Sequence, residues 1–472
     1  LNAGGKKSIN SFASSYSRTA NFLNADFDYP QRPSKLTMGT NQPDEESALI
    51  DEDLPSSYTG LNDIDANAVE DVEDNRSIRE EVLSKSGNST SPQTIFNGIN
   101  TLIGIGILTL PLGLCYAGWI PGSIILLGCA LSSQLTAKIL AKCLTKSPEL
   151  KTYGDIAQFS FGRIAHLIVV MTFTVDLLFA GISMIILFAD FFNVLTGVDK
   201  IFFKIIISTV FFALSFVKLS VLSHLSLIGI ICTSLIVCVV FACGFIKSTT
   251  PGSLIEIAPT SLWPMSFQHL LSSLGIFMSP FGGHAIFPEL YRDMKHPQKY
   301  NGACTTIFSF TWLVDFIMAS LGYLMFGNSV TDQVTKSIMI TDDYPKWINL
   351  VICALMGLLP ISKGPLITRP IITMADQLTL NLSLKPKSHN SDTVIRFMNR
   401  LVVILLFFIT SLIFTNFGRI MSFLGSAICF SICIVYPLSF YLKLYYTEIS
   451  KPVRIAIYIG ILTALTLAVL GT

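Results

Sequence analysis

Long apolar runs alternate with short polar stretches along most of this chain, from about residue 94 to its end. A helix of about 20 apolar residues crosses a hydrocarbon core about 30 Å thick, and it satisfies its own backbone hydrogen bonds there. The pattern therefore predicts an all-α polytopic membrane protein with eleven transmembrane helices, at residues 94–116, 119–142, 164–194, 201–217, 222–246, 268–290, 301–325, 346–376, 397–415, 418–443 and 453–471.

Residues 1–90 follow a different pattern, with 16 acidic and 8 basic residues, whereas residues 91–472 hold 15 acidic and 24 basic ones. A segment rich in Ser, Asn and Asp cannot bury enough apolar surface to offset its ordering entropy. We therefore expect a disordered acidic tail at 1–90 and a transmembrane domain at 91–472. With 51% hydrophobic and 13% charged residues overall, the composition excludes an ordinary soluble protein. We expect a lipid bilayer, and no nucleic acid, among its partners.

The basic residues of the loops predict the orientation of the spans. If the tail is cytosolic, the loops on its side carry fifteen Lys and Arg, and the opposite loops carry six. Trp119, Trp263 and Trp347 lie near the opposite boundary, as an interfacial aromatic belt would place them. This bias favours a cytosolic N-terminus, and eleven spans then place the C-terminus on the lumenal side.

The first predicted span contains residues that weaken helices. Within "NTLIGIGILTLPLG", Gly104 and Gly106 precede Pro111, so the helix can unwind there. The sixth span, "SLGIFMSPFGGHAIFPEL", carries a denser cluster that includes Pro280 and Gly282. Small residues also permit close packing of membrane helices, which is the alternative interpretation of each cluster alone.

The two clusters lie about 175 residues apart and open two consecutive sets of five spans, about 94–246 and 268–443, followed by an extra helix at about 453–471. This arrangement indicates a 5+5 inverted repeat with broken helices 1 and 6, whose breaks point to a binding site. Free N–H groups at one break suit a carboxylate, and free carbonyls at the other suit an ammonium, so a zwitterion fits. The predicted substrate-binding residues are Asn100, Thr101, Ile103, Gly104, Ile105, Gly106, Ile107, Ser279, Phe281 and Gly282.

Four stretches carry a resemblance to a known family: "TIFNGINTLIGIGILTLPLGLCYAGW", "FGGHAIFPELYRDMKHP", "YLMFGNSVTDQVTKS" and "LPISKGPLITRPI". With them the chain resembles the amino acid/auxin permeases, most closely the fungal vacuolar neutral amino acid transporters. The resemblance implies a leucine-transporter-like fold and proton-coupled amino acid transport. It also implies that neutral amino acids move into an acidic vacuole by antiport, with the proton gradient as energy source and no cofactor.

Ionisable residues inside spans are costly and are therefore functional candidates. His284, at the second break, titrates near neutral pH and is a candidate for proton coupling, or else a neutral cap of freed carbonyls. Asp176 is a candidate proton carrier or partner of a cation. We expect Asp190 to be solvated and Asp315 to pair with a basic neighbour.

Lys363 lies in the middle of the eighth span. In sodium-coupled proteins of the resembled fold a cation lies between the first break and this span, so the resemblance implies that the Lys363 ammonium replaces that ion. The alternative is a lysine that extends to the cytosolic interface.

A sorting signal and three rival functions remain open. Residues Glu45 to Ile50, "EESALI", match an acidic-dileucine pattern that sorting adaptors bind, which agrees with a vacuolar membrane. The alternatives are a vacuolar exporter, a plasma-membrane symporter and a receptor-like amino acid sensor. No HExxH, GxSxG or P-loop pattern is present, and the ten cysteines form no CxxC, so we expect neither an enzyme nor a metal site.

Overall fold

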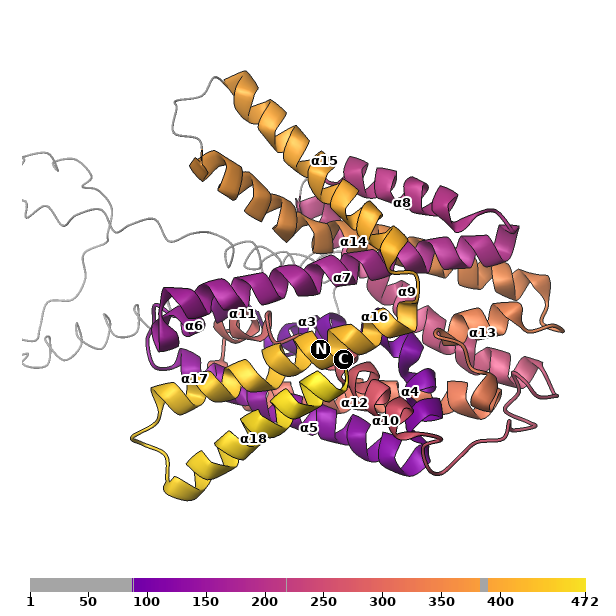
Figure 1. The fold of residues 1–472 in the computed structure, drawn as a ribbon, viewed down its shortest axis with the longest axis horizontal. Helices are drawn as coiled ribbons and strands as arrows, with labels where there is room; N and C mark the ends of the chain where they lie inside the picture. Colours follow the sequence, from indigo (N-terminus) through magenta and orange to yellow (C-terminus); the bar gives the residue numbers. More distant parts are fainter. Residues whose placement is uncertain (1–86, 88, 218, 383–388) are drawn as a thin grey trace, which may run out of the picture. The chain divides into compact units, whose positions relative to one another are not determined.

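The structure is a computed structural model, and it describes residues 87, 89–217, 219–382 and 389–472. The predicted acidic tail, apart from its last residues, and the Glu45 to Ile50 signal lie outside them. The described helices, numbered as in Figure 1, are α3 (Ser91–Leu102), α4 (Leu110–Ala117), α5 (Trp119–Leu144), α6 (Tyr153–Phe161), α7 (Arg163–Thr196), α8 (Lys200–Leu214), α9 (Leu219–Ile246), α10 (Phe267–Met278), α11 (Phe287–Arg292), α12 (Tyr300–Phe326), α13 (Val334–Ile340), α14 (Lys346–Leu382), α15 (His389–Ile413), α16 (Phe417–Phe423), α17 (Tyr436–Leu444) and α18 (Lys451–Leu470).

The helices lie where the apolar runs predict them. Fewer than eleven of the described helices, however, are long and apolar enough to cross a membrane. Within the described residues, eight helices can cross a membrane, or nine if α3 and α4 count as one bent span. The other two predicted spans correspond to α8, which has 15 residues, and to the interrupted stretch from α10 to α11. The polytopic all-helical class is confirmed, whereas the count of eleven is not.

Small residues hold the helices close together. A Cβ added to Gly275 in α10 would lie 2.0 Å from the carbonyl oxygen of Ser422 in α16. One added to Gly364 in α14 would lie 2.2 Å from the Phe211 ring of α8. Lipid tails are as apolar as leucine, so close van der Waals packing of this kind, and not the hydrophobic effect, holds membrane helices together.

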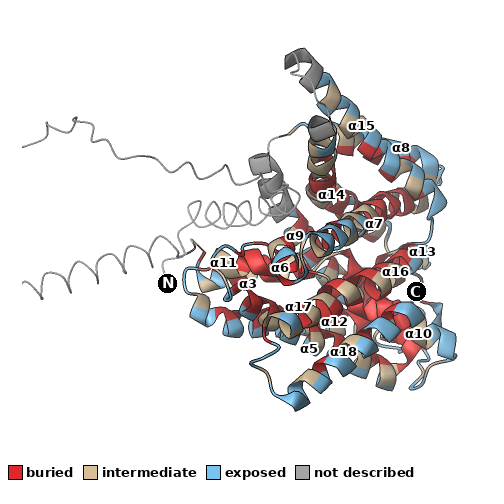
Figure 2. Cartoon of the chain, turned by 60° about the vertical axis from the view of Figure 1, so that its left-hand side comes forward, coloured by how far each residue is buried: buried red, intermediate tan, exposed pale blue. Residues whose placement is uncertain are grey.

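The outer faces of the helices are strongly apolar. On α18, Ile455, Leu462 and Val469 are all exposed, and α7 and α15 also carry exposed large apolar residues. Figure 2 shows exposed positions on these helices in pale blue. In water such an extended apolar surface would be a liability. Facing lipid it needs no cover, which agrees with the predicted bilayer.

Two short helices lie where loops were expected. Helix α6 begins after Thr152, whose hydroxyl accepts from the Asp155 backbone N–H while the Asp155 carboxylate accepts from the Thr152 backbone N–H. This capping box satisfies N–H groups that a helix start would otherwise leave free. Helix α13 follows α12 and carries Lys336. Both helices are too short to cross a membrane, so hydropathy alone did not indicate them.

Candidate functional site

The first span is interrupted at the predicted glycines. Helix α3 ends at Leu102, and Ile103 and Gly104 are extended, with Gly104 at φ −121° and ψ −155°. The chain resumes as a 3-10 turn, η1 (Ile105–Thr109), which leads into α4, and the segment Ile105–Ala117 is bent by 47° from α3. The first helix is therefore broken as predicted.

The second break lies in the sixth span and faces the first. Helix α10 ends at Met278, a 3-10 turn η2 covers Ser279–Phe281, and no helix resumes until Phe287. A Cβ added to Gly106 would lie 3.0 Å from the Ser279 Oγ and 3.4 Å from the Pro280 nitrogen. The two breaks therefore touch, and Gly106 permits their close approach.

A cavity of about 160 Å³ lies where the two breaks meet. It is lined by residues of both breaks, of α7 and of the tenth span, namely Thr101, Leu102, Gly104, Ile105, Gly106, Asp176, Ala180, Ser279, Pro280, Gly282, Met421, Leu424 and Cys429. Asp176, from α7, is the one charged side chain in this lining. A Cβ added to Gly104 would have no atom closer than 4.0 Å, so this position borders open space.

Six of the ten predicted substrate-binding residues line this cavity, and four do not. Asn100, Ile103, Ile107 and Phe281 are absent from the lining. Ile107 is 1% exposed, and the buried Phe281 ring stacks on Phe308 of α12 with 6.3 Å between centroids. Ile107 and Phe281 are therefore part of the packed interior.

His284 lies beside the break but outside the cavity lining. Its Nε2 is 3.0 Å from the Thr136 Oγ1 and 3.1 Å from the Ser133 carbonyl oxygen, both in α5. A ring nitrogen bonds a carbonyl only when it carries a hydrogen, so the contact with the Ser133 carbonyl requires a hydrogen on Nε2. His284 therefore connects the sixth span to the second, and its part in proton coupling stays a prediction.

Lys363 reaches the first break. Its Nζ donates a hydrogen bond of 3.1 Å to the carbonyl oxygen of Ile103, the first residue after α3. Gly229 of α9 makes room for it, because a Cβ there would lie 3.1 Å from the Lys363 Cγ and 2.7 Å from the Ser362 Oγ. The side chain thus points toward the break and does not extend to an interface, while its functional role remains a prediction.

The tenth span contributes lining residues that the sequence did not indicate. Between α16 and α17 the chain forms π-helical turns, η5 (Leu424–Cys429) and η6 (Ser431–Val435). Such turns are frequent at functional sites. A Cβ on Gly425 of η5 would lie 1.7 Å from the Gly275 carbonyl oxygen, so η5 meets α10 backbone to backbone. The glycine at 425 was the available signal, but a lone glycine does not predict a π-helix.

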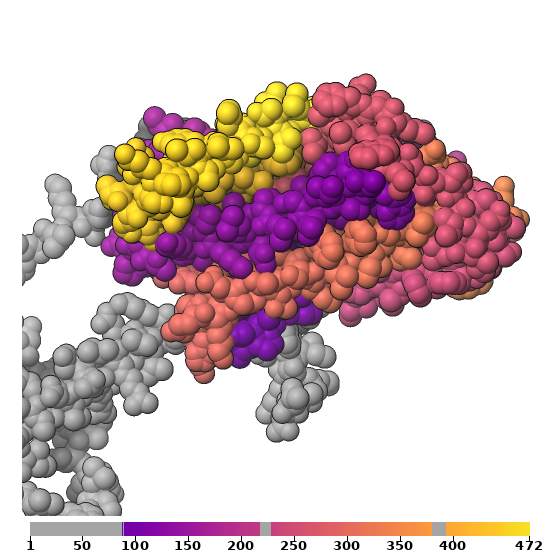
Figure 3. All heavy atoms as spheres, turned by 90° about the horizontal axis from the view of Figure 1, so that it is seen from below, coloured from indigo at the N-terminus to yellow at the C-terminus, as the bar shows by residue number. Residues whose placement is uncertain are grey.

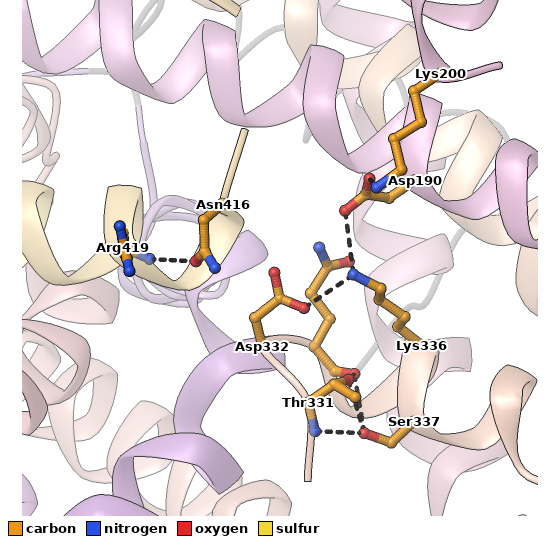
Figure 4. A network of polar contacts seen from close by, with 9 residues as sticks. Asp190, Lys200, Thr331, Asp332, Lys336, Ser337, Asn416 and Arg419 are labelled. Atoms are coloured by element: carbon orange, nitrogen blue, oxygen red, sulfur yellow. Dashed lines mark hydrogen bonds and ion pairs between the residues drawn. The ribbon is translucent and has the colours of Figure 1, made fainter. Parts of the chain in front are cut away.

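The expectation that Asp190 is solvated is wrong. Its carboxylate is buried, 2.6 Å from the Lys200 Nζ and 3.5 Å from the Lys336 Nζ, and Lys336 also lies 3.2 Å from Asp332 (Figure 4). Burial lowers the pKa of Lys336, but the two carboxylates outweigh it and leave that pKa raised. This ion-pair network joins α7 to α13.

The predicted pairing of Asp315 with a basic neighbour is not found. The carboxylate is fully buried in α12 and has no hydrogen-bond or ion-pair partner within the described part of the chain. Thr311, one turn earlier, has a buried hydroxyl that is likewise unpartnered there.

Residues 87–472 match the family described as "Transmembrane amino acid transporter protein". The chain belongs to this transmembrane amino acid transporter family. Amino acid transporter AVT1E of Arabidopsis thaliana is 25% identical over 435 residues, covering 88% of this chain and 78% of that relative. Amino acid transporter AVT1H of the same plant is 28% identical over 417 residues, covering 85% and 93%. The expected amino acid/auxin permease family is confirmed, and the fungal vacuolar branch stays a prediction.

A solved structure shows the same fold. Mhp1, a nucleobase-cation-symport-1 family transporter in a closed conformation with bromovinylhydantoin bound, matches with a TM-score of 0.50, covering 82% of this chain and 90% of that one at 11% identity. At this identity the likeness concerns the fold alone, and it confirms the leucine-transporter-like class. The relatives and this neighbour are transporters, in agreement with the expectation that the chain is not an enzyme.

Proposed function

We propose that this member of the transmembrane amino acid transporter family carries neutral amino acids in exchange for protons, from the cytosol into an acidic vacuole. The observation that carries the proposal is the small cavity enclosed by the two helix breaks. The names of relatives such as AVT1E, an amino acid transporter, support the substrate class.

The size and lining of the cavity favour a small neutral amino acid. Its volume of about 160 Å³ is below the roughly 300–1,000 Å³ of pockets for drug-sized ligands. The N–H groups at the start of η1 suit the substrate carboxylate, and Asp176 suits its ammonium. No other charged side chain lines the cavity, so a charged substrate side chain would find no partner there.

Asp176 offers a direct way to couple the substrate to protons. An ionised carboxylate attracts the substrate ammonium, and protonation of that carboxylate removes the attraction. A proton entering from an acidic lumen would thus promote release of the amino acid on that side, which is the order that antiport requires. Each pH unit corresponds to about 1.36 kcal/mol, so a lumen about two units more acidic supports roughly 100-fold accumulation per proton.

Lys363 provides a fixed positive charge at the first break. Its ammonium donates to the Ile103 carbonyl, a group that a metal cation would otherwise coordinate. On this basis transport needs no sodium. The cytosolic N-terminus, the lumenal C-terminus and the adaptor signal at Glu45 to Ile50 belong to the same proposal, since loop charge and the motif support them.

Counterflow and pH-driven uptake in proteoliposomes test the proposal. We expect radiolabelled neutral amino acids to accumulate in vesicles with an acidic interior, with or without sodium. The variant Asp176→Asn should lose pH-driven uptake at least tenfold, whereas Asp342→Asn, an exposed aspartate between α13 and α14, should not. Flux that requires sodium and ignores pH would contradict the proposed coupling.

A further inference from the structure

An apolar groove runs along the outside of the helices between α5, α17 and α18. It has a volume of about 700 Å³, and no charged side chain lines it. Gly128 and Leu135 of α5, Ile434 of η6 and Gly460 of α18 are among its walls. In Figure 3 the yellow C-terminal helices lie directly beside the purple α5. Gly128, Leu135 and Val453 of its walls are exposed, so the groove opens at the outer surface that faces the bilayer.

The groove adjoins a second pocket of about 500 Å³, the lysine pocket. The two cavities share Leu135, Ile139 and Tyr441 in their linings. The lysine pocket adds Lys138 and Lys142 near the end of α5. The apolar groove and the lysine pocket therefore adjoin each other. The lysine pocket lies at the boundary that loop charge predicts to be cytosolic.

The two lysines of the pocket keep their positive charge available. The Lys138 Nζ donates to the Thr305 Oγ1 at 2.8 Å, and the Lys142 Nζ donates to the Tyr441 Oη at 3.1 Å. These partners are neutral, and an ammonium has three hydrogens to donate. Within the described residues neither lysine pairs with a carboxylate, whereas Lys146 one turn further pairs with Glu448.

We propose that these joined cavities bind one anionic phospholipid, with its net negative headgroup beside Lys138 and Lys142 and an acyl chain in the apolar groove. The charge of the pocket is complementary to a headgroup of net negative charge, and anionic lipids are concentrated in the cytosolic leaflet. The groove alone would not select a lipid, because lipid tails are as apolar as the residues that line it. Selectivity therefore comes from the two lysines.

The bound lipid lies against the transport machinery. Thr136 of α5 lines the apolar groove, and its hydroxyl is 3.0 Å from the Nε2 of His284 beside the second break. An acyl chain in the groove thus supports the face of α5 opposite the broken sixth span.

Native mass spectrometry of the purified full chain tests the site directly. Phosphatidylserine and phosphatidylcholine with identical acyl chains are added in turn, and the bound fraction of each is measured. We expect phosphatidylserine to bind more tightly. We expect Lys138→Gln combined with Lys142→Gln to weaken phosphatidylserine about 25-fold, about fivefold for each lysine, with phosphatidylcholine unchanged. The matched control, Lys443→Gln with Lys451→Gln, removes two interfacial lysines that line neither cavity and should change nothing.

A second variant tests the groove. No atom lies within 4 Å of a Cβ added to Gly128, which lines the groove, so Gly128→Leu places its side chain in the groove and should prevent phosphatidylserine binding. Glycerophosphoserine, the headgroup without tails, should not compete. Equal binding of both lipids, equal loss in the control variant, or competition by glycerophosphoserine alone would each overturn the proposal.

Discussion

Replacing Lys363 by methionine isolates the role of its ammonium at the first break. Methionine keeps most of the length and apolar volume of the side chain in the space that Gly229 leaves open. What disappears is the charge and the hydrogen bond of 3.1 Å from Nζ to the Ile103 carbonyl oxygen. The substitution therefore tests an electrostatic contact with little change in packing.

The substitution has two opposing effects on the free energy of unfolding. A hydrogen bond from a charged donor contributes about 1.5–3 kcal/mol, whereas a charged side chain near the centre of a membrane helix costs about 2.5–3.5 kcal/mol. The net effect of Lys363→Met on unfolding is thus about 2 kcal/mol or less. Transport has no such compensation, because the Ile103 carbonyl loses the donor that holds the break. The same 1.5–3 kcal/mol corresponds to a loss of flux of about 10- to 150-fold.

Thermal unfolding in detergent and counterflow in proteoliposomes measure the two quantities separately. We expect the Tm of Lys363→Met to stay within a few degrees of the parent while the flux per folded molecule falls at least tenfold. Lys346→Met, the same change at the exposed start of α14, should alter neither. Unchanged flux at unchanged Tm, or a fall in Tm that fully accounts for the lost flux, would refute the reasoning.

Three further predictions concern the first break, the glycine contacts and the ion-pair network of Lys336. Gly104→Leu should fold normally, because the backbone at this position is extended and borders open space. It should nevertheless abolish counterflow, because the leucine side chain fills the cavity. A loss of folded protein would contradict this prediction. Gly275→Ala places a Cβ 2.0 Å from the Ser422 carbonyl oxygen and should cost about 3 kcal/mol, whereas Gly128→Ala should be neutral or stabilising in the same thermal assay. Because the pKa of Lys336 is raised, its stabilisation is complete below the unfolded lysine pKa of about 10.4 and is lost as pH rises through the folded value. We expect the Tm of the parent to fall between about pH 8 and about pH 11.5, a range that spans the lysine pKa, and the Tm of Lys336→Met to fall less. Identical Tm profiles of the two proteins would contradict this prediction.

Much of the fold could be predicted from local sequence. The length of an apolar run decides whether a helix can cross a bilayer, so most spans begin and end within a few residues of their predicted bounds. Glycine and proline act on their own backbone, so Gly104 and Pro280 indicated both breaks. Helix α15 begins at His389 and not near 397, because the polar residues before its apolar run also continue the helix.

Other features depend on which segments meet, and only the tertiary structure decided them. Lys363 could equally have extended to an interface, and its contact with Ile103 exists because α14 passes the first break beside Gly229. Asp190 is buried because α13 brings Lys336 to it. Sequence by itself determined which segments form long apolar helices and where two of the helices break, since both follow from neighbouring residues. The packing of distant segments decided which side chains enclose the cavity between those breaks.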